Sequence, residues 1–170
     1  MAEAYSGPSY VRIRKSLTDL VTLGLSPYSV AEKGAALVEL EILIRHRRGL
    51  NDNASDDERD AADADALLAL LEEAVHRRRI ASRKFRRVLR FVLPIYTEEG
   101  FEQYRDASLE ARRTAAGQNL TGNEHDEPVE PSTIRTYYEP KALSKLAVVL
   151  IHMESEHRGE TPPDDLPNVG

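Results

Sequence analysis

The 170-residue chain has no cysteine and no tryptophan, and it lacks long apolar runs. Without cysteine, disulfide bonds, thiolate metal sites and cysteine nucleophiles are excluded. The longest apolar runs, such as residues 146–151, are far too short to span a bilayer. The first eight residues lack a charged start followed by an apolar run, which predicts no signal peptide. We therefore expect a cytoplasmic protein with no membrane partner.

The sequence also lacks the common motifs of catalysis and phosphate binding. It contains no Gly-rich phosphate loop, no GxSxG, no HExxH and no EF-hand pattern. His152, Glu156 and His157 are the best candidates for metal ligands, because the first two lie four residues apart on one helical face. Two histidines and one glutamate without a second cluster are explained equally well as surface groups at a helix end. We expect no enzymatic activity, no cofactor and no metal.

Charge is distributed unevenly along the chain, whose net charge is -6. Residues 51–75 carry nine acidic groups and one basic group, whereas residues 76–90 carry eight basic groups and no acid. A protein that is acidic overall and has one concentrated basic segment binds an anion, if at all, through that segment.

The basic segment is ordered by helical spacing. Because each helical residue advances about 100°, Phe85, Val88 and Leu89 fall on the apolar side of the helix. The opposite side carries a stripe of arginines, flanked by His76 and Arg87: Arg79, Arg83, Arg86 and Arg90. The stripe rises by roughly 16 Å, so it can follow several phosphates spaced about 3.4 Å apart. The alternative is a solvated basic face balanced by nearby acids, the usual meaning of a helical charge run.

These features predict a non-enzymatic nucleic-acid-binding accessory protein or regulator that contacts the phosphate backbone of DNA or RNA. The predicted contacts are Arg79, Arg83, Lys84, Arg86, Arg87 and Arg90. Phosphate contacts position a protein without reading the bases, so sequence preference is not predicted. Tyr137 and Tyr138 are further candidates for stacking on bases, although adjacent tyrosines beside Pro140 are also typical of packing at a helix start.

A second function fits the same charges. The acidic segment 56–65 of one chain can pair with the basic segment 76–90 of another, antiparallel to it. The protein is then an interaction or oligomerisation module, and its partner is an acidic protein surface or a second copy of the chain.

The hydrophobic spacing predicts an all-α fold, a single bundle of about five helices over residues 9–159. The predicted helices cover residues 9–23, 27–48, 56–93, 97–116 and 140–157. Residues 37–44 are expected at the centre of the core, and a strand over 38–44 is the alternative, because several residues there are β-branched.

Turn and capping residues refine this outline. Ser55 and Glu58 form a capping-box pattern. Arg78 falls on the apolar side of the helix over 56–93, which indicates a break there with Ser82 as a new N-cap, and such a break removes Arg79 from the stripe. We expect residues 1–8 to be flexible, residues 118–131 to form a mobile acidic loop and residues 160–170 to be a disordered tail.

Overall fold

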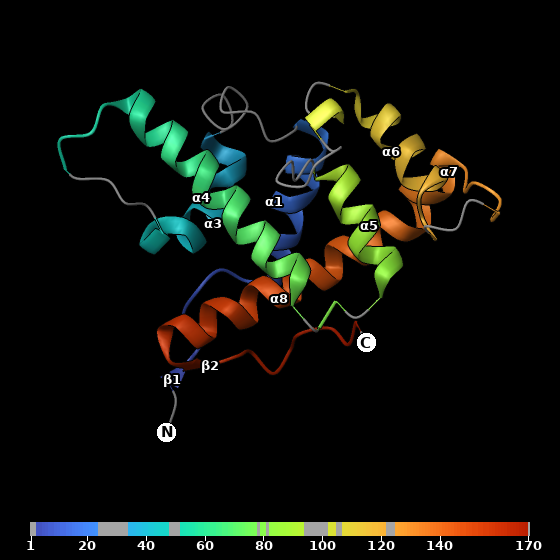
Figure 1. Ribbon diagram of the computed structural model, residues 1–170. Helices are drawn as coiled ribbons and strands as arrows, with labels where there is room; N and C mark the ends of the chain where they lie inside the picture. Colours follow the sequence, from blue (N-terminus) through green and yellow to red (C-terminus); the bar gives the residue numbers. More distant parts are fainter. Residues whose placement is uncertain are drawn as a thin grey trace.

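The computed structural model is mostly helical, which confirms the predicted all-α class. It describes residues 3–23, 34–47, 52–77, 79–80, 82–93, 102–104, 107–121 and 125–169 (Figure 1). Six helices of ten or more residues lie in this part of the chain, rather than about five, because the pattern over residues 56–93 forms two helices. None of the helices described has the length and apolarity needed to cross a membrane.

The elements follow one another in a simple order. The helices are α1 (Tyr10–Leu23), α3 (Gly34–Ile44), α4 (Asp56–His76), α5 (Arg83–Val92), α6 (Leu109–Gln118), α7 (Pro131–Thr133) and α8 (Glu139–Arg158). Two 3-10 turns, η1 (Arg45–Arg47) and η2 (Glu102–Tyr104), and one π-helical segment, η3 (Ile134–Tyr138), complete the helical part. The strands β1 (Glu3–Ala4) and β2 (Glu160–Thr161) pair in parallel. The alternative of a strand over residues 38–44 is wrong, because α3 covers them.

Helix α8 is the centre of the bundle. Helices α1, α4 and α5 all pack on it, and Figure 1 shows it crossing below them. Its residues 146–151 are all buried, as expected for a helix that is apolar on every side. The predicted centre, residues 37–44, is therefore wrong. Leu40, Leu43 and Ile44 are buried there, but α3 packs chiefly on α1 and α4 at one side of the bundle.

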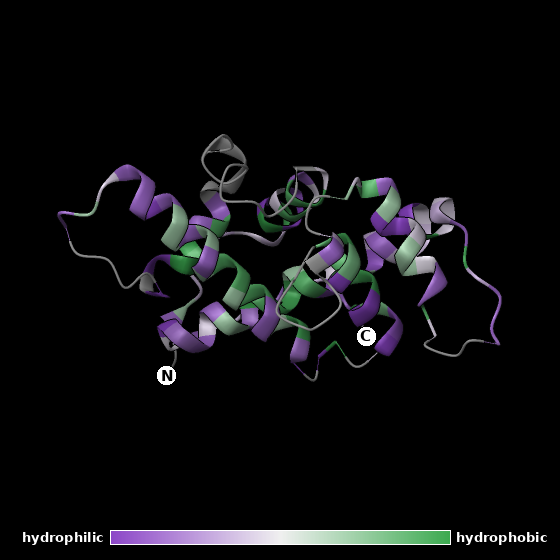
Figure 2. Ribbon diagram, turned by 45° about the horizontal axis from the view of Figure 1, so that its top comes forward, coloured by the Kyte–Doolittle hydropathy of each residue, from purple (hydrophilic) through white to green (hydrophobic). Residues whose placement is uncertain are grey.

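The basic segment is divided as the position of Arg78 predicts. Helix α4 ends at His76, and α5 begins at Arg83 with Ser82 at its N-cap position. Ile80, in the connection, is fully buried. Figure 2 shows the hydrophobic residues gathered where α4, α5 and α8 meet, while the start of α4 is hydrophilic. The burial of Ile80 fixes the turn, so the basic segment is divided between the end of α4, the connection and α5.

Local capping signals agree with the structure at several helix ends. The hydroxyl of Ser55 accepts from the backbone N–H of Glu58, whose carboxylate accepts from the N–H of Ser55 at 2.9 Å. Gly159 ends α8 with φ of 69°, in the left-handed region that favours glycine. The last helix begins earlier than Pro140, since the chain is already helical from Pro131 through α7 and η3.

The predicted helix over residues 97–116 is placed wrongly. Residues 94–101 and 105–106 lie outside the described residues, and α6 begins only at Leu109, after Ser108 caps it by accepting from the N–H of Ala111. In α6, Ala111 is exposed, whereas Arg112 and Ala116 are buried. The hydroxyl of Ser108 starts a new helix because it supplies an acceptor that an apolar residue lacks.

Both ends of the described chain pack on the bundle. The carboxylate of Glu160 accepts from the backbone N–H of Ser6 at 2.8 Å and from its hydroxyl at 2.6 Å, beside the paired strands. Residues 162–169 then run back along α8 (Figure 1), where Lys145 Nζ donates to the carbonyl oxygen of Val169. The flexible start and the disordered tail stay predictions, while the structure shows residues 3–8 and 160–169 in contact with the bundle. The contacts that hold them join positions 154 residues apart, which local composition does not reveal.

Candidate nucleic-acid interface

The structure separates the six predicted contact residues into two groups. Arg79, Arg83 and Lys84 are exposed, in the turn between α4 and α5 and in the first turn of α5. Arg86, Arg87 and Arg90, farther along α5, are half-buried. The predicted continuous stripe is therefore absent from the described structure, because the break after α4 removes Arg79 from the helix that carries the other five.

The half-buried arginines bond to the connection before α5 and to the ends of α4 and α6. Arg86 Nε donates to the carbonyl oxygen of Ile80 at 2.6 Å. Arg87 Nη1 donates to the carbonyl oxygen of Asn119, just after α6, at 2.9 Å. Arg90 Nη2 lies 3.4 Å from Nε2 of His76, the last residue of α4. Helix ends leave carbonyl groups without partners inside the helix, and cations stabilise them. These three arginines therefore join α5 to the ends of α4 and α6.

The segment η3 adds aromatic rings, and the first turns of α8 add cations, that the sequence pattern did not connect with α5. Lys141 Nζ lies 3.8 Å from the ring centroid of Tyr137, and Lys145 Nζ lies 5.2 Å from that of Phe85. The rings of Phe85 and Tyr138 are 6.3 Å apart, with an interplanar angle of 56°. Ammonium groups and rings thus alternate along one surface. We name it the α5–α8 surface, made of Arg83, Lys84, Phe85, Tyr137, Lys141 and Lys145.

The lowered pKa of the Tyr137 phenol indicates positive charge on this surface. A hydrogen bond with Lys141 and the charge of that ammonium lower the pKa of Tyr137, and the charge of Lys84 lowers it further. Lys84 belongs to α5 and Lys141 to α8, so two helices contribute to one positive region. Among the described residues, no acidic side chain forms an ion pair with Arg79, Arg83, Lys84 or Lys141.

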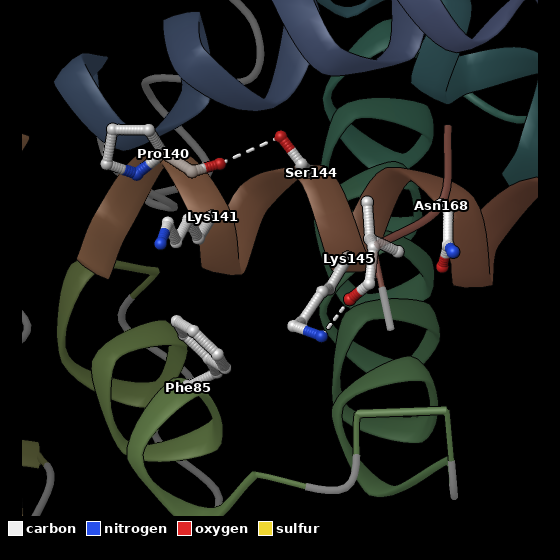
Figure 3. A pocket seen from close by; sticks show the side chains of 7 residues that line it. Phe85, Pro140, Lys141, Ser144, Lys145 and Asn168 are labelled. Carbon is white, nitrogen blue, oxygen red and sulfur yellow. Dashed lines mark hydrogen bonds between the residues drawn. The ribbon is translucent and has the colours of Figure 1, made fainter. Parts of the chain in front are cut away.

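A groove lies between α5 and the first turns of α8 (Figure 3). Its volume is about 530 Å³, and its lining consists of Phe85, Pro140, Lys141, Ser144 and Lys145 with Asn168 and Val169 of the C-terminal segment. Phe85 points from α5 toward α8. The hydroxyl of Ser144 donates to the carbonyl oxygen of Pro140 at 2.9 Å and accepts from Arg14 Nε at 3.1 Å. Arg14 of α1 therefore fixes the position of Ser144, which lines the α8 side of the groove.

The spacing of these α8 residues is a signal that sequence reasoning missed. Tyr137, Lys141 and Lys145 are each four residues apart, which places them along one side of the helix. Phe85 was assigned to the apolar side of its own helix, which is consistent with its packing against the core. Only the packing of α5 on α8 shows that its ring also lines a groove.

A second hollow lies between the end of α4 and α8. Its volume is about 370 Å³, and His76, Arg77, Arg79, Val149, His152, Met153 and Glu156 line it. Burial lowers the pKa of His152, the charge of Arg79 lowers it further, and Glu156 opposes both. Arg77 pairs with Glu73 at 3.0 Å and with Glu156 at 3.6 Å. In the described part of the chain, no three acidic, histidine or cysteine side chains come together as metal ligands.

The acidic segment lies far from the α5–α8 surface. Asp56, Asp57 and Glu58 are exposed at the start of α4, which projects to the upper left in Figure 1. Helix α4 has 21 residues and therefore extends about 30 Å. Exposed charges are screened beyond about 8 Å at physiological salt. The acids at the start of α4 therefore do not neutralise the cations at its other end within one molecule.

Comparisons of the chain with protein-family models, with curated proteins and with solved structures find no match.

Proposed function

We propose that the protein binds nucleic acid as a non-enzymatic accessory protein or regulator, and that the α5–α8 surface with Arg79 contacts the phosphate backbone. The observation that carries this proposal is the group of four exposed cations that form no ion pair with a described acid: Arg79, Arg83, Lys84 and Lys141. Unpaired cations release counterions from nucleic acid when they bind phosphates, which supplies most of the affinity of such contacts.

The overall charge of the protein favours binding of nucleic acid at the positive region. The net charge is -6, so the protein as a whole repels a polyanion, and a region of concentrated positive charge is where one can bind. Helix α5 carries further positive charge on three half-buried arginines, Arg86, Arg87 and Arg90. Their guanidinium groups bond to the connection before α5 and to the ends of α4 and α6. We therefore assign phosphate contact to the exposed cations and a positioning role to these three arginines.

The proposal is tested by gel shift against single- and double-stranded DNA and RNA at low and physiological salt. The variant Arg79→Gln/Arg83→Gln/Lys84→Gln is expected to lose most of the affinity for all of them. The control Arg12→Gln/Lys15→Gln/Arg45→Gln removes three exposed cations elsewhere and changes the net charge equally. It is expected to bind nearly as well as the parent. Equal loss in both variants would show that binding follows net charge and not this surface.

The separation of charges along α4 favours a second candidate function, self-association. The exposed acids at the start of α4 lie a helix length away from the exposed cations at its other end, and the exposed cations of another copy match them. Such pairing is electrostatic, so sedimentation is expected to show dimers or larger species at low salt and monomers at high salt. A monomer at low salt and high protein concentration rules out this candidate.

A further inference from the structure

The groove between α5 and α8 combines flat aromatic surface with positive charge. Phe85 faces it from α5, and Lys141 and Lys145 flank it on α8 (Figure 3). Its volume of about 530 Å³ falls within the range of roughly 300–1,000 Å³ that is typical of small-molecule sites. Tyr137 is not part of the lining, but its ring lies 3.8 Å from Nζ of Lys141, which lines the groove, and 49% of its surface is exposed.

We propose that this groove receives an unpaired base of single-stranded nucleic acid, which stacks on Phe85 or Tyr137 while the flanking phosphates lie on Lys141 and Lys145. This inference rests on the proposed function and adds that the preferred nucleic acid is single-stranded. Every base has a flat face, so stacking platforms beside a positive groove bind single strands with little sequence preference. In a duplex the bases are already stacked on one another, and only the phosphates reach the surface.

The present contacts of Lys141 and Lys145 show which interactions a bound strand replaces. Each ammonium now lies near a ring, Lys141 at 3.8 Å from the centroid of Tyr137 and Lys145 at 5.2 Å from that of Phe85. The rings attract an ammonium through their negative faces, and this attraction is weak at an exposed site. A phosphate carries a full negative charge, so each lysine moves from the ring to the backbone and leaves the ring face to a base. Lys145 must also give up its hydrogen bond to the carbonyl oxygen of Val169.

The helical spacing of the lysines suits a strand that passes over the groove. Lys141 and Lys145 are four residues apart on α8, so their Cβ atoms are about 6 Å apart on one side of the helix. Lys84 and Arg83 continue the line of cations onto α5. A flexible single strand can follow this line from one helix to the other and turn one base inward, whereas a stiff duplex cannot.

The test compares a labelled thymidine oligonucleotide with a duplex of equal length by fluorescence anisotropy at low salt. The variants Phe85→Leu and Tyr137→Leu remove the rings and keep apolar side chains. Tyr104→Leu is the control, because its ring packs on Phe91 at 5.2 Å and does not line the groove. We expect the parent to prefer the single strand. Each groove variant is expected to bind it about fivefold more weakly, which corresponds to about 1 kcal/mol, with duplex binding unchanged.

The outcomes separate this inference from the proposed function. If strand and duplex bind equally, and Phe85→Leu and Tyr137→Leu change neither, the groove takes no base although the surface still binds phosphates. If the parent binds neither at low salt, both proposals fail. A second readout does not depend on affinity: photo-crosslinking to a strand that carries 5-iododeoxyuridine is expected to modify Phe85 or Tyr137. Adducts found only on residues other than Phe85 and Tyr137 contradict the inference.

Discussion

Arg86 donates from Nε to the carbonyl oxygen of Ile80 at 2.6 Å, and its Nη2 donates to the carbonyl oxygen of Arg77 at 3.4 Å. One guanidinium therefore joins the second turn of α5 to the chain that leaves α4. The buried side chain of Ile80 and this arginine hold the connection between the two helices. Arg86 therefore helps to position Arg79 and Arg83, which lie on either side of Ile80 in the same basic segment.

The substitution Arg86→Gln is expected to destabilise the protein. It removes the charged donor from two carbonyl groups, and the free energy of unfolding should fall by about 1–3 kcal/mol. Urea denaturation measures the change. Arg83→Gln is the matched control on the same helix, because Arg83 is exposed and should change the free energy of unfolding by no more than about 0.5 kcal/mol. Equal effects of the two substitutions contradict the positioning role of Arg86.

A buried arginine joins the ends of two other helices. Arg112 is 4% exposed, its Nη1 donates to the carbonyl oxygen of Val92, and its Nη2 donates to that of Val21 at 3.3 Å. Arg112→Met keeps much of the volume but leaves both carbonyls without this donor. We expect a loss of about 2 kcal/mol or more in the free energy of unfolding, measured in urea beside the exposed control Arg135→Met. A fully stable Arg112→Met shows that apolar packing replaces the guanidinium.

Burial of His152 predicts a dependence of stability on pH. Burial and the charge of Arg79 lower the pKa of His152 below its ordinary value of 6.5. The unfolded chain therefore takes up the proton first as the pH falls below that value, and the free energy of unfolding decreases toward acid. Arg77 and His76 also face this hollow, and Glu156 opposes the effect of burial and Arg79 on the pKa of His152. Urea denaturation at pH 8 and about pH 5.5 should show a smaller decrease for His152→Gln than for the parent.

Removal of the C-terminal segment is expected to strengthen binding. The carbonyl oxygen of Val169 accepts from Lys145 Nζ, and Asp164 and Asp165 add negative charge to the same segment. Truncation after Thr161 frees the ammonium for one more phosphate and should steepen the salt dependence of duplex binding by about 0.9. Asp164→Asn/Asp165→Asn, in the full chain, measures how much of the gain comes from the two acids alone. Unchanged binding after truncation shows that the segment does not compete.

Local signals predicted much of the helical outline. The Ser55 and Glu58 capping box and the interruption at Arg78 depend on residues within one or two turns, so sequence spacing reveals them. The centre of the core did not follow from such signals. Residues 37–44 and residues 146–151 are both apolar on several sides, and only the packing of α1, α4 and α5 shows that α8 is the central helix.

The candidate surface was predicted only in part for a similar reason. Spacing on an unbroken helix treats Arg83 and Arg86 alike, but the carbonyl group that Arg86 meets belongs to the connection before α5. The contribution of Lys141 and Lys145 depends on two helices that are far apart in the sequence, with α6 between them. The position of the C-terminal segment depends on Glu160 and Ser6, which are 154 residues apart.

The salt dependence of duplex DNA binding tests the central claim most directly. If Arg79, Arg83, Lys84 and Lys141 neutralise about four phosphates, log K should fall with log salt at a slope near -3.6. Arg79→Gln/Arg83→Gln/Lys84→Gln should flatten that slope by about 2.7, one step of about 0.9 for each lost contact. A slope that is the same in the parent and the variant, or no binding by the parent even at low salt, contradicts the assignment of this surface to nucleic acid.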